Sequence, residues 1–133
     1  MILNLTQHLS TDDQREAGVV DLPSDKRAGL QVALTFDTPP TRAEIEERAE
    51  TIAQIAVLNG LGNNGLDDPE PRQALIGGAP FLMAALEAAL MDRHIEPVYA
   101  FSRRESVEEH QTDGSVRKTQ VFRHVGFVRP YER

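Results

Sequence analysis

Short apolar runs alternate with longer helical patterns along this chain of 133 residues. Met1 to Leu5, Val19 to Leu22 and Ala74 to Ile76 are too brief for buried helices, which predicts buried strands. A fourth strand is predicted from Pro97 to Phe101. Because a helical pattern follows each of the first three, the sequence predicts an α/β fold with a mostly parallel sheet.

Start and stop signals mark the helices between these strands. Four helices are expected: Ser10 to Ala17, Asp25 to Leu34 with Ser24 as its N-cap, a helix from the capping box at Thr41 to about Asn59, and Phe81 to Arg93. The last helix is apolar nearly all round, which predicts burial on more than one side and a homodimer. The stretch from Leu61 to Arg72, rich in Gly, Asn, Asp and Pro, predicts a surface loop.

A β-hairpin is expected at the C-terminus. Asp113-Gly114 is a turn signal, and the strand after it runs from Ser115 to Val128. The length corresponds to one domain. Residues 1–133 are therefore expected to form a single Rossmann-like three-layer domain, with a mostly parallel sheet and a C-terminal antiparallel hairpin.

Composition limits the classes of partner. The formal net charge is −7 and the pI about 5.0, which argues against general binding of duplex nucleic acid and against a basic membrane-surface protein. The chain has no cysteine and no apolar run of the roughly 20 residues that span a bilayer, so a cytoplasmic protein is expected. Residues 92–133 carry 8 basic and 7 acidic side chains, so an anionic ligand is expected in this last third.

Ligands of parallel α/β sheets bind outside the carboxyl ends of the strands, where the strand order reverses. Three segments follow predicted strands at that edge. They are Asn4 to His8, Gly77 to Pro80, and Ser102 to Arg104. Their convergence predicts the functional site.

Each of these segments has a functional and a structural interpretation. Gly77 and Gly78 before a helix could hold a phosphate on backbone N–H groups, or serve as a tight turn that needs small residues. Arg103 or Arg104 could bind a phosphate beside the Ser102 hydroxyl, or pair with nearby glutamates. His8 could act as a general acid or base, or lie on the surface.

Other kinds of site find no support in the sequence. No pair of histidines or carboxylates has metal-ligand spacing, and there is no P-loop, serine-hydrolase elbow or zinc-protease motif. No metal and no cofactor are therefore expected.

The C-terminal third resembles a known group of proteins. The run Glu96-Pro97-Val98-Tyr99-Ala100-Phe101-Ser102-Arg103-Arg104, the turn Asp113-Gly114, and Val121-Phe122-Arg123-His124-Val125-Gly126-Phe127 are similar to the ending of small CRISPR-associated proteins of the CARF-related, ring-nuclease-like group. Met1 to His8 also resembles their first strand.

The resemblance implies a Rossmann-like homodimer that binds a cyclic oligoadenylate across its two-fold axis, in antiviral defence. Some members cleave this ligand without a metal, through attack of a ribose 2′-hydroxyl on the adjacent phosphate. The resemblance places His8, Ser102 and Arg103 in catalytic roles. It assigns the ligand contacts to Asn4, Thr6, Gly77, Gly78, Ala79 and Arg104.

Two functions therefore stand at this point. The first is binding, with or without cleavage, of a nucleotide second messenger. The alternative is a non-catalytic accessory interaction protein of a phage or mobile element, in which the hairpin and the apolar helix serve a protein partner.

Overall fold

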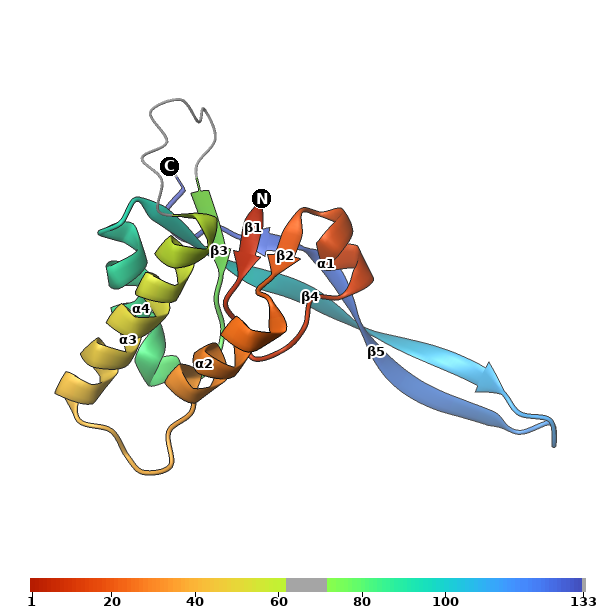
Figure 1. The fold of residues 1–133 in the computed structure, drawn as a ribbon. Coiled ribbons are helices and arrows are strands. Elements are labelled where there is room, and N and C mark those ends of the chain that lie inside the picture. Colours follow the sequence, from red (N-terminus) through yellow and green to blue (C-terminus); the bar gives the residue numbers. More distant parts are fainter. Residues whose placement is uncertain (62–71, 133) are drawn as a thin grey trace.

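Five strands form one sheet in the order β2–β1–β3–β4–β5 (Figure 1). The structure is a computed structural model that describes residues 1–61 and 72–132. Most of the loop predicted from Leu61 to Arg72 therefore lies outside the described residues. The strands are β1 (Ile2–Asn4), β2 (Val19–Asp21), β3 (Arg72–Leu75), β4 (Ile95–His110) and β5 (Val116–Val128). The first four are parallel, and β5 pairs antiparallel with β4, as the sequence predicts.

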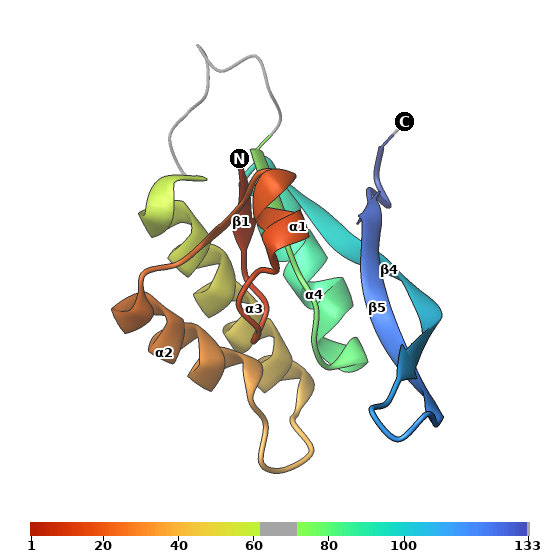
Figure 2. The same cartoon turned by 90° about the vertical axis from the view of Figure 1, so that its right-hand side faces the viewer.

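The helices form two layers around this sheet (Figures 1 and 2). They are α1 (Asp12–Glu16), α2 (Ser24–Leu34), α3 (Arg42–Ala56) and α4 (Pro80–Met91). A kinked turn over Val57–Leu61 follows α3, and Asn59 and Gly60 in it have non-helical backbone angles. The step from β1 to β2 runs in the opposite direction across the sheet to the steps from β2 to β3 and β4. Right-handed connections therefore place α1 on one face and the other helices on the opposite face. The predicted three-layer, Rossmann-like α/β fold is confirmed.

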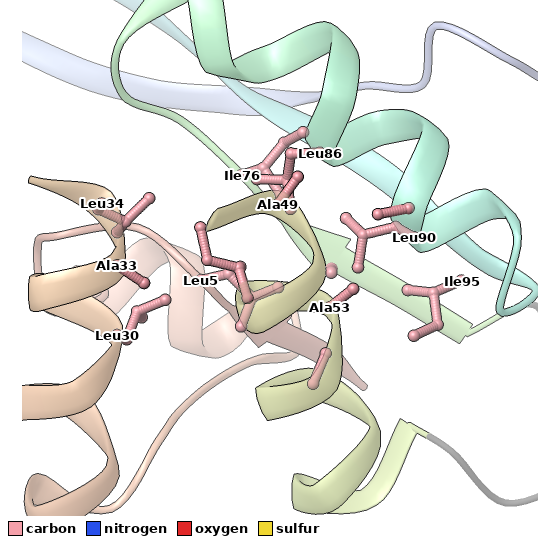
Figure 3. Close-up of a cluster of buried hydrophobic side chains, with 14 of the residues drawn as sticks. Leu5, Leu30, Ala33, Leu34, Ala49, Ala53, Ile76, Leu86, Leu90 and Ile95 are labelled. Atoms are coloured by element: carbon pink, nitrogen blue, oxygen red, sulfur yellow. The ribbon is translucent and has the colours of Figure 1, made fainter. Parts of the chain in front are cut away.

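The main core lies between the sheet and α2, α3 and α4 (Figure 3). Leu5, Ile52, Leu82, Leu86 and Leu90 are fully buried there. A smaller cluster on the other face of the sheet consists of Ile2, Val19, Leu75 and Val98, with Phe127 packed against it. Burial on both faces explains why the first strands read as continuous apolar runs rather than as alternating ones.

The helix starts follow the sequence signals with one exception. Thr11 caps α1 in a capping box with Gln14, and the Thr41 hydroxyl accepts a hydrogen bond from the Glu44 N–H. The prediction that Ser24 caps α2 is wrong. Ser24 is already the first helical residue, and Pro23, which has no side-chain acceptor, occupies the N-cap position.

One face of α4 is open to solvent. Leu82, Leu86, Ala89 and Leu90 are buried, whereas the exposed face consists of Phe81, Ala84 and Ala88. Within the single chain α4 packs against both α3 and β4, so the predicted burial on more than one side is found, while the outer face stays open. The helix is apolar all round because two alanines and the half-exposed ring of Phe81 occupy the outer face.

The fourth strand is much longer than predicted. Beyond Val98, where its pairing with β3 ends, β4 continues to His110 and pairs only with β5, with an irregularity at Phe101/Ser102. This two-stranded arm, residues 101–126, projects from the body (Figure 1). The predicted strand ended at Phe101 because the apolar pattern ends there. Both faces of a two-stranded ribbon meet water, so charged side chains replace the apolar alternation of a half-buried strand.

The base of the arm is fixed by the residues that follow it. Arg129 donates to both carboxylate oxygens of Glu96, with Nε–Oε2 at 2.8 Å and Nη2–Oε1 at 2.9 Å. The Tyr99 and Tyr131 hydroxyls both donate to Glu87 of α4. The Arg129 guanidinium holds the pKa of Glu96 below its ordinary value, although burial opposes this shift. These contacts hold the base of the arm against the body of the protein. Beyond the base, β4 pairs only with β5.

Gly114→Val tests the turn at the arm's tip. Gly114 has φ of +84°, a left-handed conformation that costs a β-branched residue about 1–2 kcal/mol. We expect faster amide hydrogen exchange throughout residues 105–121, measured residue by residue. Gly29→Ala is the control, because Gly29 is exposed inside α2 and should gain about 0.5–1 kcal/mol. Unchanged exchange in Gly114→Val would contradict the described turn.

Candidate functional site

The strand order locates the crevice where a ligand is expected. Connections leave β1 and β3 toward opposite faces of the sheet, so the reversal of the strand order lies between these two neighbours. In open parallel sheets, ligands bind outside the carboxyl ends of the strands at this position. The segments that follow β1 and β3 there are residues 5–11 and 76–79. We call this region the β1/β3 edge.

Asn4 organises the segment after β1. Its Nδ2 donates to the His8 carbonyl and to Asp21 Oδ1, both at 2.8 Å. Its Oδ1 accepts from the Thr6 N–H at 2.9 Å and from the Thr6 hydroxyl at 2.7 Å. These four bonds use the full capacity of an amide side chain that is only 5% exposed. Asn4 therefore shapes the loop and offers no free polar group to a ligand.

Asp21, at the end of β2, holds the other end of the same loop. Its carboxylate accepts from Asn4 and also from the Ser10 N–H at 3.1 Å and the Ser10 hydroxyl at 2.9 Å. Burial raises the pKa of Asp21, but these hydrogen bonds and the Arg27 charge outweigh burial and hold that pKa below its ordinary value. The resulting stabilisation is fully present above the unfolded-state pKa and is lost as the pH falls through the folded-state pKa.

Thr6 and Gly77 bring the two segments together. A Cβ at Gly77 would lie 3.6 Å from Thr6 Cγ2, which is ordinary van der Waals contact. His8 follows on the same loop with its side chain exposed. Only its backbone carbonyl takes part in the hydrogen bonds of the loop, so the imidazole is available to solvent or to a ligand.

The segment after β3 is a glycine turn that opens α4. Gly78 has φ of +140°, which gives this residue a structural reason to be glycine. Ala79 is the N-cap and Pro80 the first helical residue, and no side chain caps the helix. The turn therefore presents backbone and the positive end of the α4 dipole, without a side chain that competes for them.

Ser102, Arg103 and Arg104 lie on the arm. The Arg104 guanidinium stacks 5.3 Å from the centroid of the Phe122 ring, while the neighbouring Arg103 lies on the opposite face of the ribbon. Within residues 1–61 and 72–132, no hydrogen bond or ion pair joins these three side chains to the β1/β3 edge. The structure thus brings Asn4, Thr6, His8, Gly77, Gly78 and Ala79 together and places the serine and the two arginines elsewhere.

Among the described residues, no ion pair joins Arg103 or Arg104 to a glutamate of the arm. Arg123 forms an ion pair with Glu105 at 2.5 Å. Glu108 and Glu109 lie opposite Lys118 and Arg117 in the register of the two strands. The alternative interpretation, in which Arg103 and Arg104 pair with these glutamates, is therefore not the arrangement in the structure.

Sequence reasoning missed three groups near the β1/β3 edge. Asp21 and Ser10 hold the loop after β1, and the rule that found Asn4, a polar residue at a strand end, applies equally to Asp21. Phe36 was missed as well. Its ring lies 5.2 Å from that of Phe81 in a T-shaped contact, across 45 positions of sequence, which no local pattern reveals.

The described part of the chain offers neither a metal centre nor a membrane-spanning helix. There, no group of three or more His, Asp or Glu side chains is placed to hold a metal ion. No helix among these residues has the length and apolar character needed to cross a membrane.

Asn4→Ala tests the role of the amide. Removal of four hydrogen bonds, with partners left in a partly buried loop, should lower the free energy of unfolding by about 2–4 kcal/mol in a urea titration. Asn59→Ala is the matched control. Among the described residues Asn59 makes one side-chain hydrogen bond, to the Ile55 carbonyl, so the substitution should cost about 1 kcal/mol or less. Equal losses in both variants would show that Asn4 does not organise the loop.

Comparison with known proteins gives one match, to a protein family. No curated protein and no solved structure matches the chain. Residues 1–128 match the model of the family described as "Uncharacterized protein MJ1673 family". The match spans nearly the whole chain, and the protein therefore belongs to the MJ1673 family.

Proposed function

We propose that the protein binds a phosphate-bearing nucleotide at the β1/β3 edge, and that this ligand is a second messenger of the cyclic oligoadenylate class. The observation that carries the proposal is the junction of Thr6 with an uncapped glycine turn at the point where the strand order reverses. It is the position in the fold at which a ligand is expected on physical grounds.

The chemistry of this junction suits an anion. The chain carries a net charge of −7, so a phosphate needs a local source of positive potential. The backbone N–H groups of the glycine turn and the dipole of α4 supply it, since Pro80 has no N–H and the Leu82 N–H already donates to the Ala79 carbonyl. The glycines let a phosphate approach the backbone closely. The exposed imidazole of His8 stands on the adjoining loop.

The ligand class rests on the resemblance of the C-terminal third, not on the family match. A cyclic oligoadenylate has repeated phosphates, so two protomers related by a two-fold axis can share it. The open face of α4 at Ala84 and Ala88, away from the ring of Phe81, supports a homodimer that places the two sites side by side. In this proposal the arm delivers Ser102 and one of the two arginines, Arg103 or Arg104, to the shared ligand, because the two arginines lie on opposite faces of the ribbon.

Cleavage, where it occurs, follows from the same positions. The ribose 2′-oxygen attacks the adjacent phosphorus and loses its proton to a base, for which His8 is the candidate. The bond from phosphorus to the 5′-oxygen breaks, and that oxygen takes up a proton. The products are a 2′,3′-cyclic phosphate and a free 5′-hydroxyl, so no atom from water or from a metal enters the step. The protein supplies position and charge neutralisation.

A second candidate function is a protein interaction module. The arm favours it, because Phe101, Phe122 and Val125 are each at least half exposed on a two-stranded ribbon. Such a ribbon gains stability when a partner covers it. This function predicts that nucleotides do not change the stability of the protein.

A ligand panel tests the proposed function. Thermal unfolding is measured with cyclic tri-, tetra- and hexa-adenylates, linear oligoadenylates, AMP and inorganic phosphate. A ligand at 100 times its Kd should stabilise the folded state by about 2.7 kcal/mol, which raises Tm by several degrees. We expect this rise with at least one cyclic oligoadenylate. No rise with any nucleotide would exclude the proposed function and favour the interaction module.

The variants Ala79→Asp and Ala79→Asn locate the ligand in the same assay. Either side chain can cap α4, so both should raise the stability of the free protein by about 1 kcal/mol. Aspartate also places a negative charge where the phosphate is expected, so it should abolish the ligand-induced rise, whereas asparagine should reduce it less. Full retention of the rise in Ala79→Asp would place the ligand elsewhere.

A further inference from the structure

A groove of about 550 Å³ lies between the α2–α3 connection and the start of α4. Phe36, Pro39, Pro40, Ile45 and Phe81 form most of its wall, and Asp37 adds a carboxylate. This volume is within the range of small-molecule sites, which are mostly apolar with a few polar groups. We call it the Phe36–Phe81 groove.

One wall of the groove is rigid. Arg48 lies 4.7 Å from the centroid of the Phe36 ring. The guanidinium is itself held, because its Nη1 donates to the Val32, Ala33 and Thr35 carbonyls at the end of α2. Phe36 is half-buried, whereas Phe81, in edge contact with it, is 50% exposed. An aromatic surface is thus held open to solvent beside a fixed partner.

The groove borders the glycine turn. Phe81 follows Ala79 by two residues, and a Cβ at Gly78 would lie 4.0 Å from Leu34 Cδ2, at the end of α2. Phe36 is two residues further along the chain from Leu34. The turn and the groove are therefore neighbouring parts of one surface, joined through the first turn of α4.

We propose that the Phe36–Phe81 groove holds the base of the nucleotide whose phosphate lies at the glycine turn, and that it prefers a base with an exocyclic amino group. Flat bases stack on aromatic side chains, and prolines and isoleucine complete an apolar slot. The Asp37 carboxylate accepts hydrogen bonds only, so it favours an amino group such as that of adenine over the carbonyl of uracil. This inference rests on the proposed function and names its base-recognition subsite.

The test compares two cyclic oligonucleotides with the same backbone. Cyclic oligoadenylate and cyclic oligouridylate, of the ring size that gives the largest rise in Tm, are titrated into the full chain by calorimetry. The native protein should bind the adenylate at least about tenfold more tightly. Phe81→Ala should weaken adenylate binding roughly 5- to 100-fold, while Phe81→Tyr, which keeps the ring, should retain it.

Leu58→Ala is the control, because Leu58 is an exposed apolar residue outside the groove and should leave both affinities unchanged. If Phe81→Ala leaves adenylate binding intact, the groove does not hold the base, although the proposed function still stands. An equal affinity of the native protein for both rings would overturn the base preference. No binding of either ring would overturn the proposed function together with the groove.

Discussion

The amide of Asn4 is the interaction on which the candidate site depends. Its four hydrogen bonds join the end of β1, the loop that follows and the end of β2. A buried amide must have its donors and acceptors paired, so the loop has little choice of conformation once Asn4 is buried. This fixed loop sets Thr6 against Gly77 and leaves the His8 side chain at the surface. Asn4 therefore shapes the site through its internal hydrogen bonds and does not itself offer a group that binds a ligand.

Two-sided burial of the sheet explains how so short a set of strands holds this arrangement. β1 and β2 contain three residues each, yet β1 contributes Leu3 to the main core and Ile2 to the smaller cluster. Alternation sends neighbouring side chains to opposite faces, and helices cover the main one. The glycine turn then follows β3 directly into α4, which buries Leu82, Leu86 and Leu90. Loop and turn are thus anchored in the same core.

Local sequence patterns predicted the features of the fold that depend on residues close together in the chain. The strand positions, the Thr41 cap and the turn at Gly114 follow from apolar runs, caps and backbone conformation. Contacts across the chain were out of reach, because nothing near Phe36 indicates Phe81. The hairpin and its turn were predicted, but the continuation of β4 past Phe101 into the arm was not, because a ribbon in water needs no apolar alternation. Ser102 to Arg104 were therefore placed at the β1/β3 edge, whereas β4 carries them past it. Asp21 was within reach of the strand-end rule and was not recognised.

The central claim is that the β1/β3 edge is the place where this protein meets its ligand. Nitrogen-15 NMR of the full chain, titrated with the cyclic oligoadenylate that gives the largest rise in Tm, tests it most directly. The account predicts that the largest amide shift changes occur at Thr6, Gly77, Gly78 and Phe81. Shift changes confined to the arm, or to the opposite edge of the sheet around Glu96 and Arg129, would contradict it.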